Sequence, residues 1–142
     1  MLSPEVFQGR SVAAAAIAAH ECGHAVQHST SYFWLGMRSK MVPVVNASSR
    51  IMQFVFIASI FGMYSLSMGG NTILLVLIGT QAVIASFAVI TLPVEYDASR
   101  RALVWLKGAG ITNPQNHNMA EDALKWAART YLVAAVAAVT QL

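Results

Sequence analysis

Three histidines and a glutamate lie close together in residues 18–28, AAHECGHAVQH, of a chain that has only 4 histidines. His20 and His24 are four positions apart, so on an α-helix they share one face and both imidazoles can bind one metal ion. Glu21 lies beside that ion, where it can take a proton from an attacking water and pass it to a leaving amine. This HExxH pattern predicts hydrolysis of peptide bonds with one Zn²⁺ per chain.

Two further side chains of this stretch are expected to stay off the metal. His28 lies about 12 Å along the helix axis from His20, too far for both to bind one ion, and we expect it only to line the approach. Cys22 points about 200° away from His20 and is expected to pack as a small residue. As the single cysteine it excludes an intrachain disulfide and a cysteine-rich zinc site.

A catalytic zinc normally takes three protein ligands and leaves a fourth position for water. Among the other carboxylates, Glu95 and Asp97 follow a long apolar segment, and acids at a membrane boundary need a reason to be there. We expect Glu95 to be the third ligand, with Asp97 as the substitute. The alternative is that these carboxylates pair with a neighbouring arginine, Arg100 or Arg101.

The composition is typical of a membrane protein. Hydrophobic residues make up 56% and charged residues 11% of the chain, against roughly 45–50% and 25% in soluble domains. Residues 51–94 contain no Asp, Glu, Lys, Arg or His, which leaves room for two spans of about 20 residues each. The SMGGN stretch at 67–71 favours a turn between them. We therefore predict an all-α membrane protein with a transmembrane hairpin near 51–68 and 72–92.

The elements ahead of this hairpin must position the histidines. Residues 11–29 are predicted to be a helix, because alanines fill its first turns and Ser11 can cap it. Residues 31–43 are predicted to be a connector with aromatic side chains at the membrane interface. Pro43 is then expected to open a helix that runs into the first span.

After the hairpin, Pro93 is expected to kink or restart the chain. An amphipathic helix that carries Glu95 should follow and end near Gly108 or Gly110. The residues from 119 onward should form a C-terminal helix that is partly apolar, and whether it spans the bilayer is left open.

Basic residues flank the hairpin on both sides, whereas the 67–71 turn has none. By the positive-inside rule, both flanks and the HECGH helix are then cytoplasmic. The formal net charge of +3 is attributed to topology and to contact with anionic lipid, because no aromatic-and-basic pattern for nucleic acid is present. The expected partners are membrane lipid and a peptide or membrane-protein substrate, with no nucleic acid. The oligomeric state is left open.

Three blocks, GRSVAAAAIAAHECGHAVQH, LGMRSKMVPVVNASSR and TLPVEYDASRRAL, resemble in order and spacing the YugP-type neutral zinc metallopeptidases of bacterial membranes. The resemblance covers the chain from residue 2 onward. It implies one membrane-embedded zinc peptidase domain, residues 1–142, in the bacterial inner membrane, distantly similar to the HtpX and CAAX-prenyl proteases. It also implies that His20, His24 and Glu95 hold zinc and that Glu21 is the catalyst. Because members of this family begin with an extra membrane helix and often continue further, we expect this chain to be truncated at both ends.

One departure from the distant HtpX-like relatives concerns support of the site. Their ligand glutamate is followed four positions later by an aspartate, and Ser99 occupies that position here. Ser99 could still donate a hydrogen bond to a ligand, and Asp97 could supply the missing carboxylate. An alternative function is a catalytically weak or inactive membrane scaffold that retains the zinc site. A metal transporter is disfavoured, because the spans contain no ionisable residue.

The group that would stabilise the oxyanion during hydrolysis cannot be chosen from the sequence. Four side chains with a proton to donate are candidates: Tyr96, Arg100, His117 and Tyr131. Arg38 and Lys40 are expected instead to set the membrane topology.

Overall fold

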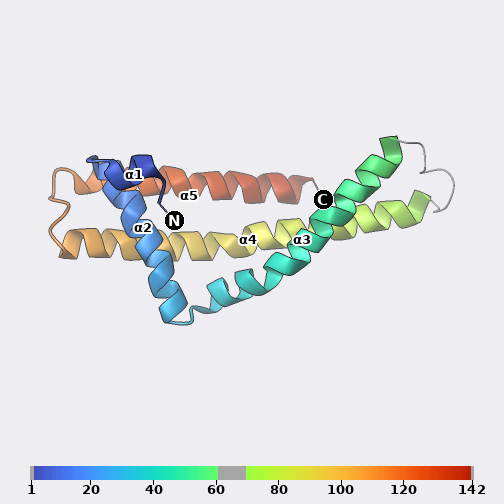
Figure 1. Ribbon diagram of the computed structural model, residues 1–142, viewed down its shortest axis with the longest axis horizontal. Helices are drawn as coiled ribbons and strands as arrows, with labels where there is room; N and C mark the ends of the chain where they lie inside the picture. The colour runs from blue at the N-terminus through green and yellow to red at the C-terminus, as the bar shows by residue number, and fades with distance from the viewer. Residues whose placement is uncertain (1, 61–69, 142) are drawn as a thin grey trace.

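Helices make up nearly all of the computed structural model, which describes residues 2–60 and 70–141 (Figure 1). In chain order they are α1 (Pro4–Gln8), α2 (Val12–Ser29), α3 (Phe33–Ile60), α4 (Gly70–Gly108) and α5 (His117–Thr140). The described ranges contain no strand. The predicted all-α class is confirmed.

Helix α2 begins and ends close to the predicted limits of residues 11–29. The Ser11 hydroxyl accepts a hydrogen bond of 3.1 Å from the Ala14 N–H, which satisfies a backbone donor that the helix itself leaves unpaired. Alanines then fill the first turns at no cost in side-chain entropy. At the other end, the Thr30 hydroxyl donates to the Val26 carbonyl at 2.8 Å. Local sequence therefore fixes the helix that carries the two histidines.

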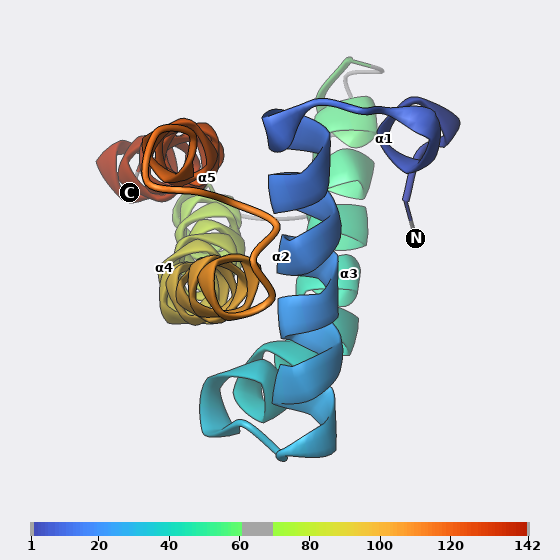
Figure 2. The same cartoon turned by 90° about the vertical axis from the view of Figure 1, so that its left-hand side faces the viewer.

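The helices form two layers. Helices α4 and α5 run antiparallel beside each other, and α2 crosses both at a steep angle (Figures 1 and 2). Helix α3 leaves the end of α2 and runs diagonally along α4, while α1 packs on α2 (Figure 1). The crossing of α2 over α4 brings the HECGH segment onto the carboxyl-terminal third of a long helix from a distant part of the sequence.

A small core fills the place where α2, α4 and α5 meet. Most of its residues are alanines, which let helix backbones approach closely: Ala16, Ala19, Ala102, Leu106, Ala120 and Leu124. Leu106 is fully buried, and burial of a leucine side chain stabilises a fold by about 1.5–3 kcal/mol. This core holds the crossing of α2 next to the site.

Two helices are long and apolar enough to cross a membrane, judged by length and composition. The segments are Phe33–Ala58 in α3 and Ile73–Gly108 in α4. Inside the protein, 6% of the apolar window of the first and 17% of the second is buried, whereas the core helix of a soluble protein is mostly buried. Large side chains such as Phe54 and Leu75 are 71% and 69% exposed. Apolar surface of this extent is typical of contact with lipid.

The predicted helix starts at Pro43 and after Pro93 are wrong, because both prolines lie inside helices, whereas a kink at Pro93 stays a prediction. Helix α3 begins at Phe33 and contains Pro43, so most of the predicted connector at 31–43 is helical. Helix α4 continues through Pro93, so the helix that carries Glu95 does not restart after the second span. Proline removes one backbone hydrogen bond from a helix, and contacts of α4 with three other helices compensate for that loss.

The predicted turn at 67–71 is described only in part. Residues 67–69 lie outside the described residues, as does the end of the predicted first span. The remaining two residues of the turn, Gly70 and Asn71, already belong to α4.

Candidate metal centre

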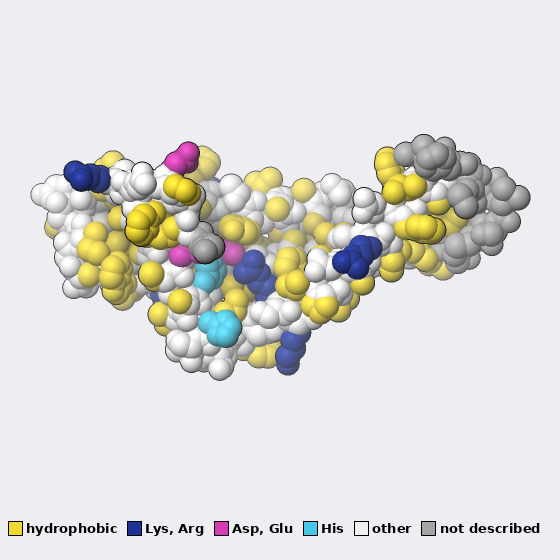
Figure 3. Space-filling model, in the orientation of Figure 1, with side chains coloured by type: hydrophobic (Ala, Val, Ile, Leu, Met, Phe, Trp, Pro, Cys, Tyr) yellow, Lys and Arg dark blue, Asp and Glu magenta, His cyan; other side chains and the backbone are white. Residues whose placement is uncertain are grey.

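The two histidines of the HExxH pattern meet on one face of α2. The centroids of the His20 and His24 rings are 4.6 Å apart with their planes 85° apart, and their Nε2 atoms are separated by 3.1 Å. This follows from the four-residue spacing on a helix. Figure 3 shows histidine side chains over α2, with acidic and basic side chains gathered beside the upper one.

Glu95 reaches the same point from α4. It is only 2% exposed, and its Oε2 lies 3.2 Å from His20 Nε2 and 3.4 Å from His24 Nε2. The three ligand atoms therefore form a nearly equilateral triangle. They come from two helices, and Glu95 is more than 70 positions from either histidine in the sequence.

The triangle has the dimensions that a zinc ion requires. Tetrahedral Zn²⁺ with bonds of about 2.0–2.1 Å keeps its ligand atoms about 3.3 Å apart. The three separations lie between 3.1 and 3.4 Å. Two imidazoles and one carboxylate are also a donor set of zinc hydrolases that keep the fourth position open. The residues present therefore fit Zn²⁺ in both geometry and chemistry.

The Nδ1 atoms of the two histidines, which face away from the triangle, each contact another side chain. Ser99 Oγ lies 3.1 Å from His20 Nδ1, and Gln27 Oε1 lies 3.0 Å from His24 Nδ1. When the Nδ1 atoms carry the protons, both Nε2 lone pairs and the Glu95 oxygen converge on one position. A cation is the ordinary way to satisfy three converging acceptors. In this arrangement Ser99 accepts from His20, whereas the sequence suggested that it would donate.

Asp97, the predicted substitute ligand, is not part of the triangle. Its Oδ2 accepts from Arg101 Nε at 2.6 Å and from Gln27 Nε2 at 2.9 Å. The ion pair with Arg101 is the alternative that the sequence left open. Asp97 is nevertheless connected to the site, because it accepts from the side-chain amide of Gln27 and that amide contacts His24.

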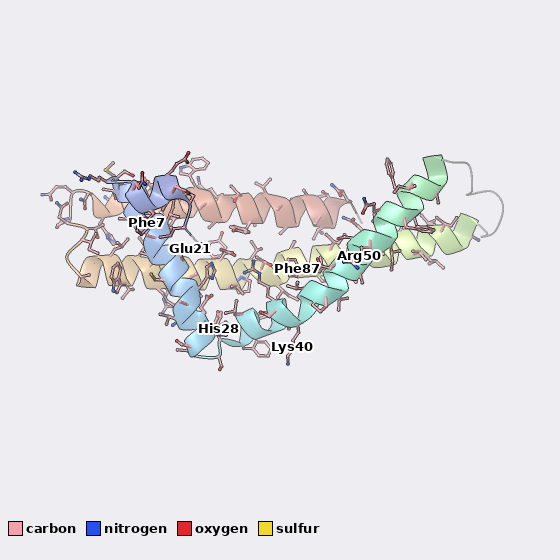
Figure 4. All side chains as sticks on the ribbon, viewed as in Figure 1. Phe7, Glu21, His28, Lys40, Arg50 and Phe87 are labelled. Carbon is pink, nitrogen blue, oxygen red and sulfur yellow. The ribbon has the colours of Figure 1, made fainter. Side chains whose placement is uncertain are left out.

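Two other residues of the HECGH region lie apart from the triangle. His28 is exposed near the end of α2 (Figure 4) and lines an open hollow together with Tyr32 and Lys40. Cys22 is exposed, which corrects the expectation that it packs as a small residue. Its position on α2, away from the face that contacts α4, explains the exposure.

Arg38 is a site residue that the sequence analysis assigned to topology alone. Its Nη1 lies 3.6 Å from Oε1 of Glu95, the carboxylate oxygen that does not face the histidines. The Arg38 side chain is 31% exposed. No local pattern could have shown this contact, because α3 and α4 are brought together by the fold.

Glu21 follows His20 on α2 and is exposed (Figure 4). The phenol of Tyr131, on α5, lies near enough to be influenced by its charge. Burial of Tyr131, together with the negative charges of Glu95 and Glu21, raises the pKa of the phenol above its ordinary value, while Arg38 opposes the rise. Tyr131 thus holds its proton more tightly than an ordinary tyrosine, and it can donate a hydrogen bond.

The other three candidate oxyanion donors have different surroundings. Tyr96 and Arg100 line a hollow of about 340 Å³ between α4 and α5, which Ser99 also lines. His117 Nδ1 is 2.8 Å from the Thr112 hydroxyl, in the loop before α5. Tyr131 therefore becomes the candidate donor, because the charges of both Glu95 and Glu21 act on its phenol.

The carboxylate of Glu95 also alters the proton affinity of the histidine pair. Its contact with Nε2 raises the pKa of His24 above 6.5, although burial acts in the opposite direction. The hydrogen bond with Gln27 adds to the rise. Without a metal, His24 therefore keeps a proton up to a higher pH than a free imidazole does.

Gly23 allows α2 to approach α4 beside the site. A Cβ atom at this position would lie 2.6 Å from the Ala98 carbonyl oxygen, which belongs to the α4 backbone. Only a residue without a side chain fits such a separation. The sequence did not indicate a functional role for Gly23 or Gln27. The only signal for Gln27 was its spacing of three positions from His24, which places these two side chains next to each other on a helix.

Comparisons with known proteins agree with this geometry. A family model described as "Putative neutral zinc metallopeptidase" matches residues 1–142. The "Putative membrane protease YugP" of Bacillus subtilis (strain 168) is 38% identical over 141 residues. The match covers 99% of this chain and 60% of that relative, so the chain spans less than two thirds of its length. No solved structure matches the chain.

Proposed function

Because this chain belongs to the neutral zinc metallopeptidase family, we propose that it is a membrane-bound peptidase whose zinc is held by His20, His24 and Glu95. The observation that carries the proposal is the triangle of two Nε2 atoms and one carboxylate oxygen, separated by 3.1–3.4 Å. Its size supports one Zn²⁺ per chain. Two apolar helices support attachment to a membrane.

The reaction would be hydrolysis of a peptide bond. Zn²⁺ bound at the triangle would polarise the scissile carbonyl and make the attacking water more acidic. Glu21 accepts one proton of that water while the oxygen adds to the carbonyl carbon. Glu21 would then give the proton to the amide nitrogen as the C–N bond breaks, which would release a carboxylic acid and an amine. The acid would pass its remaining proton to the amine to give a carboxylate and an ammonium group. Tyr131 is proposed to donate a hydrogen bond to the developing oxyanion.

The place of the reaction follows from the charge distribution. The basic flanks of the apolar segment favour a cytoplasmic location for α2 and the carboxyl-terminal part of α4. The site would then face the cytoplasmic surface of a bacterial inner membrane. Peptides and membrane proteins near the bilayer are the proposed substrates.

Replacement of Glu21 by Gln tests the chemistry separately from the metal. We expect Glu21→Gln to lose hydrolysis by about 10²- to 10⁴-fold, the usual contribution of general acid–base catalysis, and to keep one zinc per chain. His24→Ala should lose both hydrolysis and tight zinc binding. The measurements are zinc content by elemental analysis and cleavage of a broad peptide library by the purified protein in lipid.

Two outcomes would contradict parts of the proposal. Full turnover by Glu21→Gln would exclude the role given to Glu21. A wild-type protein that holds zinc and cleaves no peptide of the library would instead favour the scaffold function.

A further inference from the structure

Gln27 is fully buried on the face of α2 that crosses α4, with an exposed fraction of 0%. Its Nε2 donates to the Val94 carbonyl at 2.8 Å and to Asp97 Oδ2 at 2.9 Å. Its Oε1 lies 3.0 Å from His24 Nδ1. The side chain thus uses both of its donor hydrogens and its acceptor at once.

The contacts of Gln27 allow only one orientation of its amide. The Val94 carbonyl and the Asp97 carboxylate are acceptors and have no hydrogen to donate. In a flipped amide, Oε1 would face the Val94 carbonyl and the Asp97 carboxylate. Neither of these acceptors would then receive a hydrogen bond from Gln27, which is costly. The Nε2 side must therefore face α4, and the oxygen must face His24.

This orientation determines which nitrogen of His24 carries the proton. An amide oxygen can only accept, so His24 Nδ1 has to be the donor of the 3.0 Å contact. In the neutral imidazole the proton on Nδ1 leaves Nε2 with its lone pair free. Nε2 is the atom that lies 3.1 Å from His20 Nε2 and 3.4 Å from Glu95 Oε2.

We propose that Gln27 is a positioning residue that holds His24 in the tautomer needed to bind the metal, and that Asp97 and Arg101 hold Gln27 in turn. The proposal rests on the zinc site proposed above. Asp97 acts as a support and not as a ligand, because its carboxylate is already bound by Arg101 at 2.6 Å. These contacts form a relay of hydrogen bonds, which runs from His24 on α2 through Gln27 to the ion pair of Asp97 and Arg101 on α4.

The outer end of the relay is itself held by the fold. The guanidinium of Arg101 lies over the ring of Tyr32, 5.8 Å from its centroid, and Tyr32 belongs to the turn between α2 and α3. The Val94 carbonyl that Gln27 binds precedes Glu95 in the chain. The amide therefore ties the helix with two ligands to the helix with the third, directly beside that third ligand.

Zinc affinity of a Gln27→Leu protein tests the proposal. Leucine has a similar size but cannot accept from His24, and loss of such a partner typically weakens metal binding about 10- to 100-fold. Gln81→Leu is the matched control, because Gln81 also makes side-chain hydrogen bonds from a helix, to Ala138 and Gln141, far along α4 from the site. Affinity is measured by competition with a chelator in lipid, for the full chain.

The tautomer of His24 gives a second readout that needs no substitution. In wild-type protein with ¹⁵N-labelled histidine, we expect His24 to carry its proton on Nδ1, both with zinc and without it at alkaline pH. A solely structural role of Gln27 would not fix this tautomer. The signals of His24 are assigned by their loss in His24→Gln.

The outcomes separate this proposal from the zinc site itself. Weakened binding in Gln27→Leu but not in Gln81→Leu, with an Nδ1 proton in the wild type, supports it. Equal affinity of Gln27→Leu and wild type, or a His24 proton on Nε2 in metal-free protein, overturns it while zinc binding stands. Wild-type protein that binds no zinc removes the zinc site and, with it, the role given to Gln27.

Discussion

Glu95 uses its two carboxylate oxygens for different purposes. Oε2 faces the two histidines, while Oε1 lies 3.6 Å from Arg38 Nη1. A guanidinium beside Oε1 competes with any metal for that oxygen and so favours binding through Oε2 alone. Binding by a single oxygen keeps the coordination number low, and a position remains for water or substrate.

The Tyr131 hydroxyl is expected to matter for turnover and not for metal binding. Loss of one donor to a developing oxyanion typically lowers kcat by about 10²- to 10³-fold. Tyr131→Phe removes only the hydroxyl, so we expect a loss of this order with zinc content unchanged. Steady-state cleavage of a peptide substrate measures it. Tyr96→Phe is the control, because Tyr96 lines the hollow between α4 and α5. It should retain wild-type activity, and an equal loss in both variants would exclude the role of Tyr131.

As the pH is lowered, zinc binding should begin to weaken at a higher pH than it would with an ordinary histidine ligand. A proton and Zn²⁺ compete for His24 Nε2, and Glu95 raises the pKa of His24 above 6.5. Zinc affinity should therefore begin to fall as the pH drops to that raised pKa. A zinc titration across the pH range, with proton release recorded, measures the effect.

Metal-free protein should show the opposite dependence. A pKa raised on folding contributes stability that is fully present below 6.5 and is lost as the pH rises through the raised value. Unfolding of the metal-free protein against pH should show this decline. A stability that rises over the same range would contradict the ion pair between His24 and Glu95.

Gly23 makes the crossing of α2 and α4 sensitive to a single methyl group. In Gly23→Ala the new Cβ would lie 2.6 Å from the Ala98 carbonyl oxygen, so the two helix backbones must separate. Overpacking of this kind costs about 1–3 kcal/mol, and it would move His20 and His24 away from Glu95. We expect lower stability and weaker zinc binding, measured by unfolding and by chelator competition.

Gly36→Ala is the matched control for this prediction. Gly36 lies inside α3, and an added Cβ there meets no atom within 4 Å. Alanine is better than glycine in a helix interior by roughly 0.5–1 kcal/mol. The control should therefore be neutral or slightly stabilising, and a Gly23→Ala protein that behaved in the same way would show that the crossing tolerates separation.

Helices with local signals could be predicted from the sequence, whereas contacts between helices could not. The Ser11 cap and the spacing of His20 and His24 depend only on neighbouring residues, so α2 was predicted almost to its ends. The role of Arg38 depends on α3 lying against α4, and the role of Gln27 depends on α2 lying against α4. No short pattern encodes either contact. Pro93 suggested a break in the helix, because proline removes a backbone hydrogen bond at its own position. The contacts with other helices that keep α4 continuous lie along its whole length and cannot be read from one residue.

The membrane orientation can be tested without substitution of this chain, because Cys22 is the only cysteine in its 142 residues and is exposed. The positive-inside rule predicts that α2 is cytoplasmic. A membrane-impermeant maleimide should then label Cys22 in inside-out vesicles and leave it unlabelled in intact spheroplasts. Detergent-solubilised protein is the control for thiol reactivity. Labelling of intact spheroplasts would place the metal site on the outer side.

The unbroken course of α4 has a consequence for the depth at which the proposed metal site lies relative to the membrane. Glu95 follows Ile73, the first residue of the apolar segment, at about 33 Å along a helix that rises 1.5 Å per residue. A bilayer's hydrocarbon core is about 30 Å thick. If the apolar segment of α4 crosses the bilayer, the length of the helix would fix the metal at the depth of the lipid headgroups. Peptide bonds could then be cut only where a substrate emerges from the membrane, and distance from the bilayer would select the bond before any side-chain pocket did.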